Sequence, residues 1–101
     1  MPVRDRITWG AGNPLRDPRL LNLPALVRDF KKGKSAWPVK VFVNRWLDLP
    51  VKPLDYYHEY YSGPKGVAGL LRIVLGKGGE VYVTGNHYRD FRQIVGMPVL
   101  Q

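Results

Sequence analysis

The sequence predicts an α+β domain in which one N-terminal helix packs on an antiparallel β-sheet meander, the fold of small proteins with segregated elements. Apolar residues recur at helical spacing between residues 23 and 30, and strand-like alternation follows from residue 39 onward. The 101 residues suffice for one domain, and 45% hydrophobic content is ordinary for a folded chain. We expect an N-terminal arm at 1–16 and a single domain at 17–101.

The predicted helix has one apolar stripe, at positions i, i+3, i+4 and i+7, formed by Leu23, Leu26, Val27 and Phe30. Asn22 is expected to cap its start, and Gly33 to end it. Pro24 is compatible with the first turn. The arm before the helix is expected to hold one short strand near residues 6–9.

The remainder of the chain has the pattern of strands joined by turns. Valines alternate with other residues after position 39, an aromatic run follows, and glycine-rich turns separate the later segments. The expected strands lie at residues 39–43, 56–61, 70–75, 80–84 and 88–95.

Charge is the strongest compositional signal. Sixteen Lys and Arg against eight Asp and Glu give a net charge of +8 and a pI near 10.1. This balance favours a polyanionic partner, nucleic acid before an anionic membrane, although a basic surface that only maintains solubility is the simpler alternative. No run approaches the roughly 18–20 apolar residues of a membrane span.

The chain has no cysteine, which excludes thiolate zinc sites. Its first residues are charged and lack the apolar stretch of a signal peptide. We therefore expect the protein either to be cytoplasmic or to be delivered as a toxin domain of a larger protein.

Three side chains, Glu59, Arg72 and His87, form the candidate catalytic group. A turn centred between residues 65 and 66 would place Glu59 directly opposite Arg72 on one face, where the guanidinium keeps the carboxylate ionised as a base. A shift of one residue in the strand register would put Glu59 and Arg72 on opposite faces of the sheet. His87 follows the next strand, in a loop at the rim of that face. The simpler interpretation is that Glu59 and Arg72 form an ordinary surface ion pair, which stabilises a fold by about 0–1 kcal/mol, and that His87 is a solvated loop residue.

Several short runs, taken in order from about residue 23 to 95, resemble the barnase-like guanyl-preferring ribonucleases, especially the short actinomycete members. The runs are Phe42-Val43-Asn44-Arg45, Leu49-Pro50, Tyr56-Tyr57-His58-Glu59-Tyr60, Arg72-Ile73-Val74, Gly79-Glu80-Val81-Tyr82 and Thr84-Gly85-Asn86-His87-Tyr88 with Phe91. The resemblance implies cleavage of single-stranded RNA to a 2′,3′-cyclic phosphate without a metal or cofactor.

Residue roles follow from the same resemblance. Glu59 matches the base, His87 the acid, and Arg72 the cation that stabilises the pentacovalent phosphate. Residues expected to contact the substrate are Phe42, Asn44, Arg45, Trp46, Lys65 and Tyr88. His58 is expected to be structural, because alternation sends it to the opposite face from Glu59.

The sequence departs from the family at two positions. Ala68 stands where the family has a second active-site arginine; Lys65 is the nearby cation, and we expect either reduced activity or partial substitution by Lys65. Trp46 stands where a glutamate normally binds guanine; tryptophan can stack on a base or pack under the loop, but cannot accept those hydrogen bonds. Guanine preference is therefore not carried over.

Two alternatives to the enzyme stay open. One is a non-catalytic RNA-binding module on the same scaffold, and the other is a basic domain that binds a protein through its tyrosine-rich face. For the enzyme we expect RNA as partner, a monomeric state, and an acidic inhibitor protein that covers the basic cleft.

Overall fold

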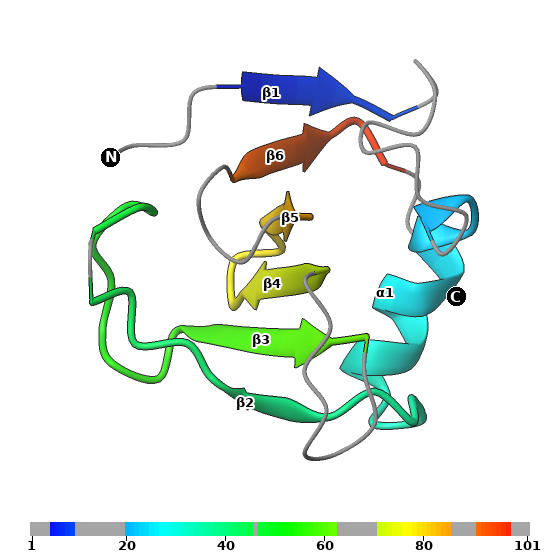
Figure 1. The fold of residues 1–101 in the computed structure, drawn as a ribbon, viewed down its shortest axis with the longest axis horizontal. Helices are drawn as coiled ribbons and strands as arrows, with labels where there is room; N and C mark the ends of the chain where they lie inside the picture. Colours follow the sequence, from blue (N-terminus) through cyan, green and yellow to red (C-terminus); the bar gives the residue numbers. More distant parts are fainter. Residues whose placement is uncertain (1–4, 10–19, 46, 63–70, 86–90, 98–101) are drawn as a thin grey trace.

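The computed structural model describes residues 5–9, 20–45, 47–62, 71–85 and 91–97, which form one helix and a six-stranded sheet (Figure 1). The strand order is β1-β6-β5-β4-β3-β2. The helix α1 spans Leu23–Lys31, and the strands are β1 (Asp5–Thr8), β2 (Val39–Val41), β3 (Tyr57–Tyr61), β4 (Arg72–Gly76), β5 (Val81–Thr84) and β6 (Arg92–Val95). The predicted α+β class is confirmed.

Strands β2 to β6 form the antiparallel meander that the alternation predicts. The short strand expected near residues 6–9 is present as β1, and it pairs with β6 in parallel at the edge of the sheet. This parallel pair extends the predicted meander. The chain then crosses through α1 to β2 at the opposite edge, so the two ends of the sheet come from the first half of the sequence.

The helix begins where the apolar stripe predicts. Asn22 occupies the N-cap position, but its side chain makes no capping hydrogen bond, so the expected side-chain cap is wrong; its carbonyl instead accepts from the amide of Leu26 at 3.1 Å. Gly33 follows the helix with φ +68°, a conformation that glycine adopts without strain. Within the described residues, no helix is long and apolar enough to cross a membrane.

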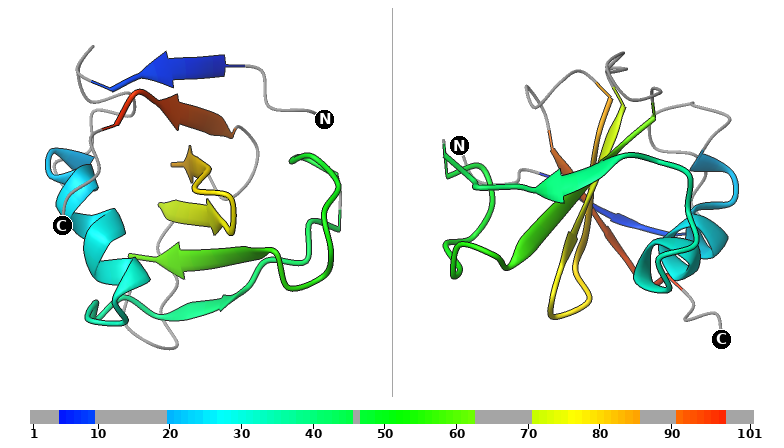
Figure 2. Two further views of the ribbon diagram at one scale, coloured as in Figure 1. Left: turned by 180° about the vertical axis from the view of Figure 1, so that it is seen from behind. Right: turned by 90° about the horizontal axis from the view of Figure 1, so that it is seen from below.

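The sheet separates two apolar clusters. On the helix side, buried residues of α1 pack against alternate strand residues; this cluster is Leu20, Leu23, Val27, Phe30, Leu71, Ile73, Leu75, Val81, Val83 and Ile94. The opposite side, which we call the open face, carries a smaller cluster of Leu49, Tyr57, Val74, Tyr82 and Phe91. Figure 2 shows α1 and the loop that follows β2 on opposite sides of the sheet. The open face is thus bordered by the loop that follows β2.

Candidate active site

The register of β3 and β4 decides where the two predicted catalytic side chains lie. Glu59 pairs with Val74, and Arg72 pairs with Tyr61. The expected direct pairing of Glu59 with Arg72 is therefore wrong by two residues, because the hairpin closes with the Ser62 amide donating to the Leu71 carbonyl at 3.4 Å. An even displacement preserves alternation, so both side chains still lie on the open face.

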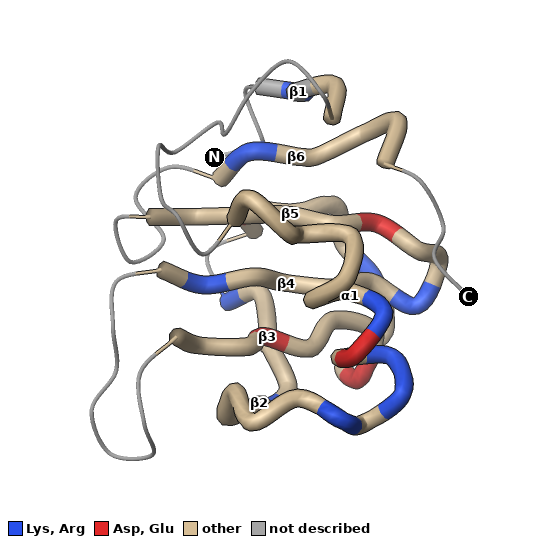
Figure 3. Tube along the Cα trace, turned by 90° about the vertical axis from the view of Figure 1, so that its right-hand side faces the viewer, with Lys and Arg blue, Asp and Glu red and all other residues tan. Residues whose placement is uncertain are grey.

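Glu59 is a buried carboxylate with a lysine beside it. Its side chain is only 2% exposed, in the middle of β3. Lys40 lies directly opposite on β2, and its Nζ is 3.3 Å from Oε1 of Glu59. Figure 3 shows one acidic position in β3 and a basic position further along the neighbouring strand β4. Sequence reasoning did not single out Lys40; the signal that could have found it is its place in a strand that pairs with β3.

Arg72 is held rigidly on the same face. It is 4% exposed, and its Cζ lies 4.8 Å from the centre of the Tyr61 ring. Such a cation–π contact fixes the plane of the guanidinium. Buried Thr84 on β5 lies opposite Arg72 in the next pair of strands. The cation is therefore positioned before any substrate arrives.

The loop after β2 is shaped by Asn44. Its Nδ2 donates to the carbonyl of Leu49 at 2.8 Å, and its Oδ1 accepts from the amide of Leu49 at 3.0 Å. Asn44 and Leu47 both have left-handed backbone, with φ +54° and +56°. Both ends of the Asn44 amide are thus engaged within the loop, so the side chain fixes the shape of the loop.

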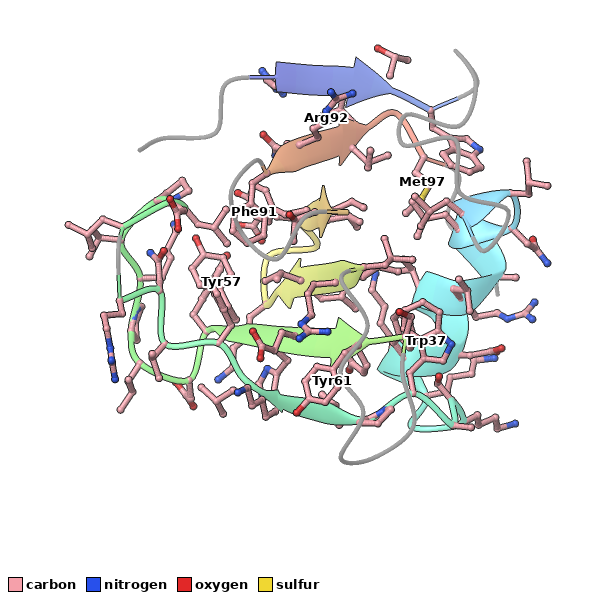
Figure 4. The ribbon with its side chains drawn as sticks, viewed as in Figure 1. Trp37, Tyr57, Tyr61, Phe91, Arg92 and Met97 are labelled. Atoms are coloured by element: carbon pink, nitrogen blue, oxygen red, sulfur yellow. The ribbon has the colours of Figure 1, made fainter. Side chains whose placement is uncertain are left out.

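Tyr57 ties this loop to the sheet. Its hydroxyl donates to the carbonyl of Pro50 at 2.7 Å, while the amide of Phe42 donates to the Tyr57 carbonyl at 2.9 Å. The ring of Phe42 meets those of Tyr57 and Phe91 edge-on. Figure 4 shows Tyr57 and Phe91 directed toward the loop, and Trp37 beside α1. Burial raises the pKa of the Tyr57 phenol, so the hydroxyl stays a donor.

A pocket of about 380 Å³ lies between this loop and Glu59. Its lining contains predicted substrate-contacting residues together with the predicted base; the lining residues are Lys40, Val41, Phe42, Val43, Asn44, Arg45, Asp48 and Glu59. Lys40 and Asp48 are the two polar members that sequence reasoning missed. The pocket thus presents carboxylates, cations and an aromatic ring, a set suited to a nucleotide.

The other predicted site residues are Trp46, Lys65, His87 and Tyr88, and they lie outside the described residues, as does Ala68. His58 is half-buried on the helix side of the sheet, opposite Val41 and Leu75. It is therefore separated from the pocket by the sheet.

Comparison with known proteins shows the family to which the chain belongs. No protein-family model matches the sequence. Guanyl-specific ribonuclease St of Saccharopolyspora erythraea is 40% identical over 83 residues, covering 73% of this chain and 82% of the relative. The chain belongs to the barnase-like family of microbial ribonucleases. Ribonuclease Sa2, solved with guanosine-2′-cyclophosphate, has a TM-score of 0.64 and 28% identity, covering 89% of this chain and 94% of its own.

A second structure of ribonuclease Sa2, from a study of its complexes with mononucleotides, has a TM-score of 0.65 and 27% identity, covering 93% of this chain and 96% of its own. The protein is accordingly an endoribonuclease. Its fold, including the helix packed on an antiparallel sheet, is that of the barnase-like enzymes.

Proposed function

We propose that this ribonuclease cleaves single-stranded RNA by metal-independent transphosphorylation on the open face. One observation carries the proposal: Glu59 and Arg72, both buried, lie on the same face of adjacent strands beside a nucleotide-sized pocket. A carboxylate and a fixed guanidinium in this arrangement supply a base and a charge-stabilising group for one phosphodiester.

The proposed reaction moves the phosphoryl group from the 5′-oxygen of the leaving nucleotide to the ribose 2′-oxygen. Glu59 takes the proton of the ribose 2′-hydroxyl, and the 2′-oxygen forms a bond to phosphorus. The bond from phosphorus to the 5′-oxygen breaks, and His87 donates a proton to that oxygen. The products are a 2′,3′-cyclic phosphate and a free 5′-hydroxyl. The role of His87 rests on the family resemblance of residues 84–88.

Arg72 stabilises the charge that develops on the phosphoryl oxygens. Its stacking on Tyr61 and its 4% exposure mean that little reorganisation is needed when the charge appears. Preorganised donors of this kind are commonly worth about 10²- to 10³-fold in kcat. The burial of Arg72 thus favours transition-state stabilisation over loose attraction of RNA.

We also propose that the base on the 5′ side of the cleaved bond is guanine, which Asp48 binds. Guanine presents adjacent N–H donors on one edge, and a carboxylate is the group that accepts both. The family places this carboxylate at the position of Trp46; here half-buried Asp48 lines the pocket two residues later. The guanyl preference of ribonuclease St supports the assignment.

The direct test is incubation with RNA in excess chelator, followed by analysis of the product ends. Wild type is expected to leave 2′,3′-cyclic phosphates, and Glu59→Gln and His87→Ala are expected to lose cleavage by about 10²- to 10⁴-fold. Glu80→Gln is the matched control, because Glu80 accepts the Tyr56 hydroxyl at 2.8 Å and does not line the pocket. RNA bound but uncut would favour the binding module, and no RNA affinity would favour the protein-interaction domain.

We further propose a biological setting in which the ribonuclease acts as a monomeric toxin domain, delivered to a cytoplasm where an acidic inhibitor protein protects the producer. The net charge of +8 and the cationic side chains around the pocket support such a partner. Expression of the wild type is expected to arrest growth, and expression of Glu59→Gln is not. Equal toxicity of both would refute the toxin proposal.

A further inference from the structure

Lys40 on edge strand β2 lies in the active site with no assigned role. We propose that its ammonium contacts the reacting phosphate and acts as the second active-site cation, where the family's second arginine is replaced by Ala68. The inference deepens the proposed function and rests on it.

The register places Lys40 next to the base. Lys40 pairs with Glu59 across β2 and β3, and its Nζ is 3.3 Å from Oε1 of Glu59. A general base must lie about 2.6–3.2 Å from the hydroxyl it deprotonates. An ammonium this close to the carboxylate is therefore also within reach of the phosphate to which the 2′-oxygen bonds.

Lys40 and Arg72 flank Glu59 from the two neighbouring strands. Arg72 on β4 lies 4.8 Å, and Lys40 on β2 lies 6.0 Å, from the centre of the same Tyr61 ring. A phosphate above β3 would thus have one cation on each side. This two-sided arrangement is what a phosphoryl group with several charged oxygens requires.

The two cations, Arg72 and Lys40, differ in burial and in flexibility. Arg72 is buried and fixed, whereas the Lys40 side chain is 64% exposed and carries three rotatable donors on a flexible stem. Lys40 also lines the pocket. Glu59 is buried, but the Lys40 ammonium stays largely in water, which limits the strength of the ion pair. When a phosphodiester enters, the flexible stem allows the ammonium to contact a phosphoryl oxygen while it stays close to Glu59.

The experiment compares Lys40→Met, Lys40→Arg and the control Lys34→Met on an RNA oligonucleotide with one cleavable guanosine link. Lys34 is exposed and does not line the pocket, so its substitution removes the same charge from the molecule. Lys40→Met is expected to lower kcat about 10- to 100-fold at the pH optimum, less than a rigid donor would. Lys40→Arg should recover most of the lost kcat, and the kcat of Lys34→Met should stay within about twofold of the wild-type value.

Two results would overturn the proposal. One is a kcat for Lys40→Met within about twofold of wild type, given an unchanged urea midpoint. The other is a displaced acid limb of the pH–rate profile with an unchanged plateau, which would show that Lys40 acts only through Glu59.

A second measurement separates this proposal from the proposed function. Calorimetric titration with inorganic phosphate needs no turnover, and Lys40→Met is expected to bind it at least about fivefold more weakly than Lys34→Met. Inactive wild-type protein would refute the proposed function alone, and the phosphate titration would still decide the role of Lys40. Equal phosphate affinity in Lys40→Met and Lys34→Met would refute the proposed role of Lys40.

Discussion

Replacing Asn44 by alanine tests how the loop beside the pocket is built. The substitution removes two hydrogen bonds to Leu49, at 2.8 and 3.0 Å, and leaves a buried amide and carbonyl without those partners. Each bond contributes about 0.5–1.5 kcal/mol. Alanine also tolerates φ +54° less well than asparagine, at a cost of about 1 kcal/mol. We expect a loss of about 3 kcal/mol in the free energy of unfolding.

The assay is thermal and urea unfolding followed by circular dichroism. For a domain of this size, about 3 kcal/mol corresponds to a fall in Tm of roughly 12–24 °C. Asn22→Ala is the matched control, because Asn22 is exposed and makes no side-chain capping bond, so a change of about 0.5 kcal/mol or less is expected. If Asn44→Ala destabilised no more than Asn22→Ala, the loop would not depend on the Asn44 side chain.

Four further outcomes follow. Tyr57→Phe should lose about 1 kcal/mol in urea unfolding, since its hydroxyl bonds Pro50 at 2.7 Å, and an unchanged midpoint would contradict this. Burial raises the pKa of Tyr57, Tyr60 and Tyr82, so stability should be full below a pH of about 10 and fall as the pH rises above it. Phenolate absorbance that corresponds to all six tyrosines and appears without unfolding would refute the assignment. Asp48→Asn should lower the preference for guanosine over adenosine links about tenfold or more, measured as a ratio of kcat/KM, and an unchanged ratio would exclude Asp48 as the guanine ligand. Ile73→Ala, at a fully buried position, should cost about 2–5 kcal/mol by the same unfolding assay, and a smaller loss would mean that the core collapses around the cavity.

Patterns within one element were predictable from the sequence. The apolar stripe locates α1, because Leu23, Val27 and Phe30 have a single face to bury. Alternation places Glu59 and His58 on opposite faces of β3 whatever the partner strand. The expectation that Glu59 and Arg72 share a face held for this reason, although their pairing was off by two residues.

The exact register between neighbouring strands was not predictable. The turn between β3 and β4 has several glycines and no unique tight-turn sequence, so the register depends on which pairing buries the faces best. The meander order predicts that β2 neighbours β3, but the two strands are separated by a long loop, so the exact register that places Lys40 opposite Glu59 was not predictable. The position of Asp48 in the pocket likewise depends on the side-chain bonds of Asn44.

The most direct test of the central claim, that Glu59 activates a ribose hydroxyl with the help of buried Arg72, uses a DNA oligonucleotide carrying one ribonucleotide, a guanosine, in excess chelator. The account predicts a single cut after that guanosine, leaving a 2′,3′-cyclic phosphate and a 5′-hydroxyl, and no cut in the all-deoxy strand. Cleavage at a deoxy link, or a linear phosphate as the first product, would contradict it.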